Sequence, residues 1–212
     1  MQKTALAKVM IVDDDPFIRV AMSSTLKSLG FDVVGSFDSA KDAVASYLEN
    51  PSELVLLDLD LGIGPNGIDL AHSLRRLNES VGIVLLTTFV DPRFADTRNL
   101  KPPKGSRYLV KSDISDISQL ITVLLQTKHR PFVENINHVD KFASLTDVQI
   151  EVWKMVADGL SSSEIAERRG ISEKAVEAII ARIYNFLGLK KVKENNPRVL
   201  LANHFKKLSG KI

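Results

Sequence analysis

Residues 54–60 read Leu-Val-Leu-Leu-Asp-Leu-Asp, an apolar run of strand length that ends in acidic residues. A second such run, at residues 9–12, leads into three consecutive aspartates. Short apolar runs of this kind are typical of buried parallel strands. Working outward from these two runs, we expect five strands, at residues 8–12, 32–36, 54–59, 82–87 and 107–110.

Amphipathic stretches separate the apolar runs. We expect helices at residues 16–29, 39–49, 67–77 and 114–127, with another near 92–99. Pro102 and Pro103 lack amide donors and disfavour helix before them, so the helix near 92–99 should be short or irregular. Strands that alternate with helices predict a doubly wound α/β fold, in which a five-stranded parallel sheet is covered on both faces. Functional groups gather at the carboxyl ends of the strands in such sheets.

The last third of the chain has a different pattern. Residues 129–143 show no sustained periodicity and contain Pro131, which predicts a linker. The pattern after it is wholly helical, with helices expected at 146–157, 161–168, 172–187 and 197–208. The sequence therefore predicts an α/β domain at 1–128, a linker at 129–143 and an all-α domain of four helices at 144–212.

The composition is that of an ordinary globular chain, with 44% hydrophobic and 25% charged residues. Cysteine is absent, which excludes a disulfide framework and thiolate metal sites and fits a reducing compartment. The longest apolar runs are far too short to span a membrane, and Asp13 interrupts the N-terminus before a signal-peptide core is complete. We therefore expect a cytoplasmic protein with no membrane partner.

Charge is distributed unevenly along the chain. Residues 1–130 carry 15 Lys and Arg against 16 Asp and Glu, whereas residues 131–212 carry 13 against 10. Residues 182–212 contain eight basic residues and one acidic residue, Glu194. A basic end beside a neutral half is typical of nucleic-acid binding, although a solvated lysine-rich helix has the same composition.

Acidic, hydroxyl and basic residues stand at the ends of four expected strands. Asp13 and Asp14 follow the first strand, Asp58 lies in the third, Thr87 ends the fourth and Lys111 follows the fifth. Carboxylates gathered at one edge of a sheet repel one another unless a cation holds them, and an all-oxygen site suits Mg²⁺. Such an ion also neutralises a phosphoryl group arriving at a carboxylate, while a hydroxyl donates to it and an ammonium pairs with it. Singly, such residues are often only helix caps or surface groups, but together and in this order they favour a site.

Residues 8–128 resemble the receiver domains of bacterial two-component response regulators, a family with a flavodoxin-like fold. The resemblance rests on the two acidic strand ends together with Thr87 and Lys111. It implies that Asp58 accepts a phosphoryl group from a histidine kinase, and that Thr87 and Lys111 bind this group. The protein would then be a phosphoacceptor rather than an enzyme.

The same resemblance implies a Mg²⁺ site and a switch residue. Asp14 and Asp58 would bind the ion directly, and the backbone carbonyl of Asp60 would complete the site. Asp13 would act through a water molecule. Tyr108, three residues before the lysine, matches the family's switch aromatic.

The match to the receiver family is not uniform. Where many receivers have Met-Pro in the loop after the phosphoacceptor, this sequence has Leu61-Gly62. Residues 91–106 replace the family's fourth helix and its Gly-Ala turn. Receivers commonly signal through that surface, so the sequence leaves the route of output open here.

A phosphatase is a remote alternative. Asp58-Leu-Asp60 also looks like the nucleophile motif of haloacid-dehalogenase-type phosphatases, with Asp58 as nucleophile and Asp60 as acid/base. In that family the motif follows the first strand, whereas here it lies at the third. The domain also leaves little room for a cap that selects substrates, so the chain order favours a receiver.

Residues 161–187 have the spacing of a tight helix-turn-helix, with the small Ala166 where the helices meet and Gly170 at the turn. An ordinary helical bundle has the same bare pattern. Over residues 142–208, however, the sequence is similar to LuxR-type DNA-binding domains. The resemblance implies that residues 172–187 form the recognition helix that enters the major groove.

The expected recognition helix departs from that family, because Ala175 and Ile179 stand where Thr and His usually contact phosphates. Base readout then falls to Glu177, which can accept from cytosine, and to Ala178 and Ala181, which can touch thymine methyl groups. Phosphate contacts are expected from the basic residues Lys174, Arg182, Lys190, Lys191 and Lys193.

These features predict a phosphorylation-regulated transcription factor that binds double-stranded DNA. The last expected helix carries an apolar stripe, which predicts a homodimer on activation or DNA binding but also fits packing within its own domain. The stripe consists of Val199, Leu200, Ala202, Phe205 and Leu208. The leading alternative, motivated by the altered recognition helix, is a phosphorylation-regulated protein-interaction module that has lost sequence-specific DNA binding.

Overall fold

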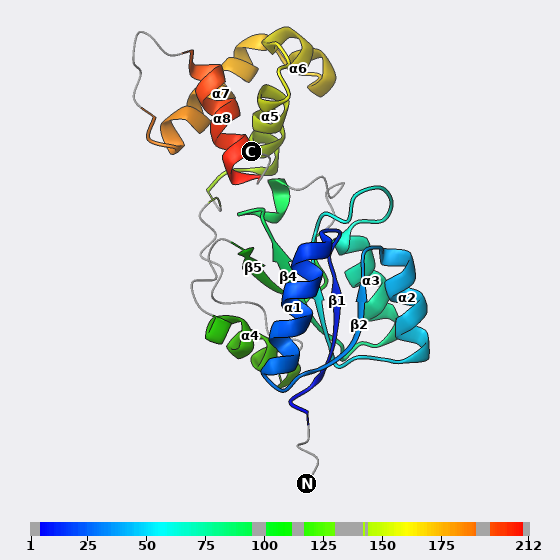
Figure 1. Ribbon diagram of the computed structural model, residues 1–212. Coiled ribbons are helices and arrows are strands. Elements are labelled where there is room, and N and C mark those ends of the chain that lie inside the picture. The colour runs from blue at the N-terminus through cyan, green and yellow to red at the C-terminus, as the bar shows by residue number, and fades with distance from the viewer. Residues whose placement is uncertain are drawn as a thin grey trace. The chain divides into compact units, whose positions relative to one another are not determined.

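The computed structural model describes residues 5–94, 101–111, 117–129, 142, 144–189 and 196–209. These residues form two compact units (Figure 1). The α/β unit contains the described residues up to Thr88 and those at 101–129, and the helical unit contains Phe89–Phe94 and the described residues from Phe142 onward. Phe89–Phe94, which the sequence placed in the first domain, is thus grouped with the helical unit.

The α/β unit is built on a five-stranded sheet in the order β2-β1-β3-β4-β5, in which all neighbouring strands are parallel. The strands are β1 Lys8–Val12, β2 Asp32–Phe37, β3 Leu54–Leu57, β4 Gly82–Thr87 and β5 Arg107–Val110. The predicted doubly wound sheet is therefore confirmed. Strand β3 ends two residues earlier than expected, so Asp58 lies immediately beyond it.

Helices cover both faces of this sheet, and they are α1 Pro16–Ser28, α2 Ala40–Glu49, α3 Gly67–Leu77 and α4 Ile117–His129. Leu26 of α1 and Leu120 of α4 are buried in one cluster with Val9 and Ile11 of β1, so α1 and α4 share a face. Helices α2 and α3 lie side by side on the other face (Figure 1). Alternate side chains of each strand therefore enter two apolar layers.

Two expected helices differ from those observed. Near 92–99 the described residues form only a short 3₁₀ helix, η1 Pro92–Phe94, and residues 95–100 lie outside the described part. Helix α4, expected at 114–127, is observed at Ile117–His129 and so extends past the expected end, while residues 114–116 lie outside the described part. Beyond His129, only Phe142 of the predicted linker is described.

The helical unit contains α5 Asp147–Ala157, α6 Ser162–Arg169, α7 Glu173–Phe186 and α8 Pro197–Leu208, close to the predicted ranges. Helix α6 ends at Gly170, whose φ of 64° is a left-handed conformation that glycine adopts without a Cβ penalty. The amide of Ile171 then donates to the carbonyl of Ala166 at 3.1 Å, which makes the predicted tight turn into α7. Helix α5 packs on α8, and the indole Nε1 of Trp153 donates to the carbonyl of Leu201 at 2.9 Å.

Within the described ranges, no helix combines the length and the apolar character that a membrane span requires.

Candidate functional site

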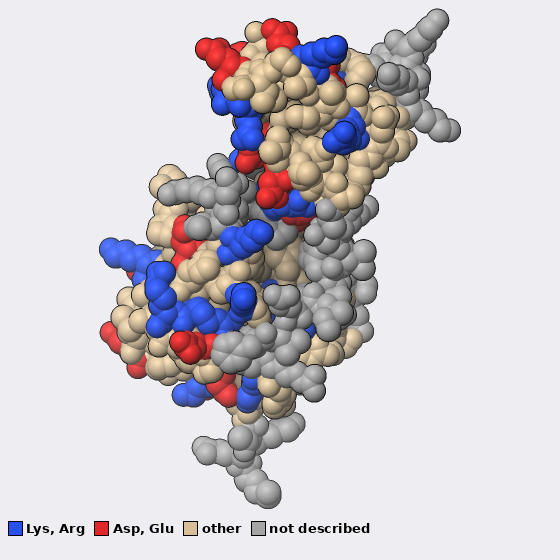
Figure 2. Space-filling view, turned by 180° about the vertical axis from the view of Figure 1, so that it is seen from behind, with Lys and Arg blue, Asp and Glu red and all other residues tan. Residues whose placement is uncertain are grey.

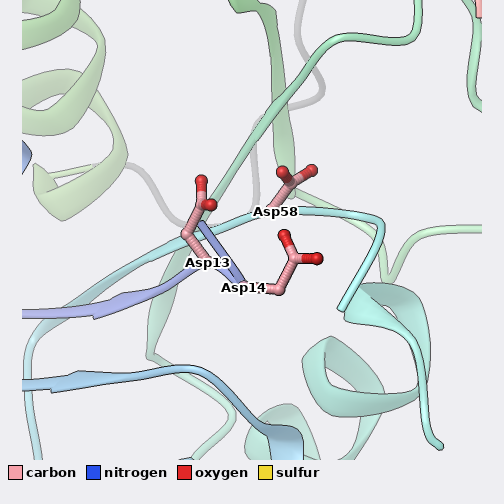
Figure 3. Close-up of side chains that lie close together, drawn as sticks. All are labelled: Asp13, Asp14 and Asp58. Atoms are coloured by element: carbon pink, nitrogen blue, oxygen red, sulfur yellow. The ribbon is translucent and has the colours of Figure 1, made fainter. Parts of the chain in front are cut away.

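Three carboxylates converge beyond the carboxyl ends of β1 and β3 (Figure 3). Asp13 and Asp14 follow β1 and Asp58 follows β3, and one ligand atom of each lies within 4.8 Å of the others. Asp13 is 4% exposed and Asp58 7% exposed, whereas Asp14 is open to solvent. The structure therefore brings together the three acidic side chains that the sequence predicted at this edge.

The sheet itself positions two of these residues. The amide of Asp58 donates to the carbonyl of Val12 at 2.8 Å, and the amide of Asp13 donates to the carbonyl of Phe37 at 3.1 Å. The parallel hydrogen-bond pattern therefore continues one residue past β1 and β3. The backbone of both aspartates is fixed before their side chains are considered.

Gly67 is a position that no other residue can occupy without movement of the site. A Cβ on Gly67 would lie 2.0 Å from the backbone oxygen of Asp58. The amide of Gly67 also donates to the carbonyl of Leu59 at 3.0 Å. The first turn of α3 is thus in direct contact with the backbone of the central carboxylate.

Lys111 provides the cation of the cluster. Its Nζ lies 2.6 Å from Oδ2 of Asp58 and 2.8 Å from Oδ2 of Asp13. Arg19, which the sequence did not predict as part of the site, donates from NH1 to the carbonyls of Asp13 at 2.6 Å and Asp14 at 3.0 Å. Arg19 lies on α1 and binds backbone oxygens rather than the carboxylates. No acidic or basic motif in the sequence therefore marks it as part of the site.

The electrostatics of the cluster favour a cation. Burial raises the pKa of Asp58, with a smaller contribution from the charge of Asp13, against the attraction of Lys111. The slight desolvation of the exposed Asp14 carboxyl and the neighbouring charges of Asp13 and Asp60 raise its pKa. Burial lowers the pKa of Lys111, but the charges and hydrogen bonds of Asp58 and Asp13 outweigh it, so the net pKa is raised. The ammonium of Lys111 therefore compensates only part of the charge of the cluster, and the carboxylates still destabilise one another's charged forms.

The remaining predicted residues of this site lie on neighbouring elements. Thr87 is fully buried as the last residue of β4, and it is paired with Val110 of β5, which precedes Lys111. Tyr108 is a buried residue of β5, 8% exposed. The Asp60 carboxylate accepts from the amide of Gly62 at 3.3 Å and is not one of the three clustered carboxylates.

The exposed face of α7 contains the base-facing and flanking residues expected from the sequence. All five of those that lie on α7 are solvent-exposed: Lys174, Glu177, Ala178, Ala181 and Arg182. Lys190, Lys191 and Lys193 lie outside the described residues. Figure 2 shows basic and acidic side chains together on one face of the helical unit, beside a broad uncharged area.

Glu177 has partners that the sequence did not predict. Its carboxylate accepts a hydrogen bond from the hydroxyl of Ser162 and lies 3.4 Å from NH1 of Arg198. Arg198 also donates to Ser162 Oγ at 2.7 Å and to the carbonyl of Leu160 at 2.5 Å. The three side chains join α6, α7 and α8, and their separation by 15 to 36 residues leaves no local signal in the sequence.

Comparison with known families identifies both units. A model of the response regulator receiver domain matches residues 9–124. A model described as bacterial regulatory proteins, luxR family, matches residues 143–194. The chain belongs to the response regulators.

Two relatives cover nearly the whole of this response regulator. It is 30% identical to the transcriptional regulatory protein TdiR of Thauera aromatica, over 86% of this chain and 80% of that protein. It is 26% identical to the response regulator protein VraR of Staphylococcus saprophyticus, over 92% of this chain and 95% of that protein. Both are therefore similar across the two units.

Solved structures show the same fold. RcsB of Salmonella typhimurium superposes with a TM-score of 0.56 at 21% identity, over 96% of this chain and 98% of that chain. A structure of two RcsB dimers bound to two parallel DNAs gives a TM-score of 0.59 at 20% identity, over 95% and 98%. At these identities the similarity concerns the fold.

Family membership also decides the broad class of activity. Response regulators are regulators rather than typical enzymes, which favours the receiver interpretation of Asp58 over the phosphatase alternative. Receiver domains in general depend on Mg²⁺ and act with histidine kinases, and LuxR-type domains bind DNA. The acidic cluster has the oxygen ligands that such an ion needs.

Proposed function

We propose that this response regulator accepts a phosphoryl group on Asp58 from a histidine kinase, in a reaction that depends on Mg²⁺. The observation that carries the proposal is the cluster of Asp13, Asp14 and Asp58 with Lys111 in contact. Oxygen ligands from Asp14, Asp58 and the backbone of Asp60 would hold the ion, with Asp13 acting through water. Bound there, Mg²⁺ would offset the negative charge of the incoming phosphoryl oxygens.

Side chains of this protein would accept and bind the transferred phosphoryl group. A carboxylate oxygen of Asp58 forms the new bond to phosphorus, while the bond from phosphorus to the kinase imidazole nitrogen breaks and its electron pair stays on that nitrogen. Lys111, 2.6 Å from Asp58, is close enough to pair with the phosphoryl oxygens once they arrive. Thr87, at the end of the adjacent strand, would donate a hydrogen bond to one of those oxygens, and Tyr108 on β5 would respond as the switch aromatic.

Labelling with a small phosphodonor tests this proposal. Full-length protein should take up label from acetyl phosphate only with Mg²⁺ present, and Asp58→Asn should take up none. Asp15→Asn is a matched control, because Asp15 caps α1 through the amides of Phe17 and Ile18 and lies outside the carboxylate cluster. Equal labelling of wild type and Asp58→Asn would overturn the assignment.

For the helical unit we propose that α7 is the recognition helix of a DNA-binding domain that acts as a homodimer. The exposed Lys174 and Arg182 would contact phosphates together with the basic residues after α7, and Ala178 and Ala181 would face bases. In α8, Phe205 is buried within its own unit while Val199 is 53% exposed, so only part of the apolar stripe is available to a second copy. Sedimentation with and without phosphodonor should show self-association on activation.

One observation favours the alternative of a protein-interaction module. The Glu177 carboxylate is held by Ser162 and Arg198, which leaves α7 with few polar groups that can read bases. Retardation of random duplex DNA at low salt discriminates between the two, since nonspecific binding needs only a basic face. Binding that weakens steeply with salt supports the DNA-binding proposal, and no binding at low salt supports the interaction module.

A further inference from the structure

Phe94, at the end of the chain segment that follows β4, is part of the helical unit's aromatic core. It is 2% exposed and makes edge-to-face contacts with Phe142, Trp153 and Phe205, with ring centroids 5.0, 5.5 and 5.3 Å apart. Trp153 and Phe205 come from α5 and α8 and also contact each other, with centroids 5.6 Å apart. Phe94 therefore completes a cluster that the helices alone do not fill.

Polar contacts anchor the same segment at two further places. The guanidinium of Arg93 donates to the carbonyls of Leu145 at 2.7 Å and Phe142 at 2.9 Å, just before α5 begins. Its orientation is fixed by Asp91, which is 2% exposed and lies 2.7 Å from NH2 of Arg93. The amide of Val90 donates to the carbonyl of Leu208, the last residue of α8, at 3.3 Å. The segment thus holds the start of α5 and the end of α8.

The segment is connected directly to the candidate phosphoryl site through the chain. Thr87 ends β4, and Phe89 is the first residue of the helical unit. Two residues extend over at most about 7 Å. A displacement of Thr87 must therefore be absorbed at Thr88 or be passed on to Phe89–Phe94.

We propose that Phe89–Phe94 is a latch through which the phosphorylation state of Asp58 controls the helical unit. In the unphosphorylated protein Phe94 and Arg93 hold α5 and α8 together. When Thr87 moves toward a phosphoryl group on Asp58, the latch is drawn out of the aromatic core and the contacts with α5 and α8 loosen. The latch rests on the proposed phosphorylation of Asp58.

The contacts of Phe89–Phe94 with the helical unit are those expected of an element that has two discrete positions. The Asp91–Arg93 ion pair joins a buried carboxylate to a partly exposed guanidinium, and such a pair adds little stability compared with apolar side chains but fixes one geometry. A core position filled from outside the helices makes the packing of α5 and α8 conditional on that geometry. Packed cores have discrete arrangements rather than a continuous range, so withdrawal of one ring produces a defined second state.

Trp153, the only tryptophan of the chain, reports on the latch in the full-length protein. Acetyl phosphate with Mg²⁺ should shift its emission to the red in wild type and leave it unchanged in Asp58→Asn. In Phe94→Ala the emission should already be red-shifted without phosphodonor, and the response should be lost while the extent of labelling stays at the wild-type level. A wild-type response in Phe94→Ala would overturn the latch.

A disulfide lock keeps the proposal testable if Phe94→Ala fails to fold. The amide of Val90 lies 3.3 Å from the carbonyl oxygen of Leu208, so these two positions are the pair chosen for the lock, and the chain has no cysteine of its own. The oxidised Val90→Cys/Leu208→Cys variant should label normally yet lose the emission response, and reduction should restore it. The single-cysteine variants are the controls.

The outcomes separate the latch from the proposed phosphorylation. Labelling of wild type without any change in Trp153 emission overturns the latch alone, as does a full response in the oxidised lock. Absence of labelling on Asp58 overturns the proposed function and the latch with it.

Discussion

The acidic site of the α/β unit and the charged groups of the helical unit are built from contacts of different range. In the α/β unit, Asp13, Asp58 and Lys111 are each the first residue after a strand, and parallel pairing brings them to one edge. In the helical unit, Glu177 acquires its surroundings from residues 15 and 21 positions away on other helices. Residues at strand ends are brought together by the order of the strands in the sheet. Residues on a helix surface acquire their partners only through the detailed packing of the helices.

Removing the cation of the acidic site should have the largest effect on stability. Lys111→Met leaves Asp58 and Asp13 buried without their partner, and breaking a buried pair costs about 3 kcal/mol. The loss should be largely recovered by saturating Mg²⁺, because the ion replaces the missing charge. Hydrogen exchange of β1 and β3 as a function of urea, with and without Mg²⁺, measures both effects.

Lys128→Met is the matched control for that experiment. Lys128 pairs with Glu53 at 3.0 Å in the same unit, but both side chains are partly exposed, at 27% and 47%. Its loss should cost less than about 1 kcal/mol and should not respond to Mg²⁺. If Lys111→Met loses as little stability as this control and does not respond to Mg²⁺, repulsion between the clustered carboxylates does not need Lys111 to offset it.

One glycine in each unit should respond differently to the same substitution. Gly67→Ala forces a Cβ against the backbone of Asp58, which should cost about 1–3 kcal/mol and reduce phosphoryl uptake. Gly170→Ala, at the turn between α6 and α7, meets no atom within 4 Å and should cost only the strain of a positive φ, about 1 kcal/mol. Phosphoryl uptake should be unchanged in Gly170→Ala. Equal loss of uptake in both variants would contradict the steric role of Gly67.

The same contrast explains what the sequence could predict. The alternation of strands and helices predicted the parallel sheet, and strand ends then predicted that Asp13, Asp14 and Asp58 would meet. Loop and helix contacts at long range were not predictable in this way. Arg93 reaches carbonyls 49 and 52 residues ahead, and Arg198 reaches Leu160, 38 residues before it. Carbonyl oxygens accept from any donor, so the identity of the acceptor residue carries no signal for such contacts.

The pH dependence of the acidic site is a further test. Deep burial of Asp58, and slight desolvation together with the charges of Asp13 and Asp60 at Asp14, raise the pKa of both carboxyls in the folded, ion-free protein above the ordinary value of 3.8. These groups therefore stabilise the α/β unit at low pH, and that contribution is lost as the pH rises through the raised values. Mg²⁺ binding needs the charged forms, so its affinity should fall as the pH drops through the same range.

The expected change is up to about tenfold in Mg²⁺ affinity per pH unit for each carboxyl that titrates, or about 1.4 kcal/mol. Calorimetric titration with Mg²⁺ at a series of pH values measures it directly. In Asp14→Asn the affinity should be lower at every pH and should depend on pH less steeply. A decline in affinity that begins only near 3.8 would contradict the raised pKa values.

The smallest expected effect concerns Glu177, and it decides how the α7 surface is used. If the carboxylate reads a cytosine, Glu177→Ala should relax preference at one base pair by about 1–3 kcal/mol. In the structure, however, it accepts from Ser162 and pairs with Arg198, and its side chain is 60% exposed. We therefore expect Glu177→Ala to free the Arg198 cation and tighten binding to matched and mismatched duplexes alike, by less than about 1 kcal/mol.

Arg198→Gln, which removes the cation instead, should weaken binding to both duplexes equally and make the slope of log affinity against log salt shallower by at most about 0.9. A loss confined to one base pair in Glu177→Ala would restore the glutamate as a reader and show that the carboxylate leaves Arg198 when DNA binds.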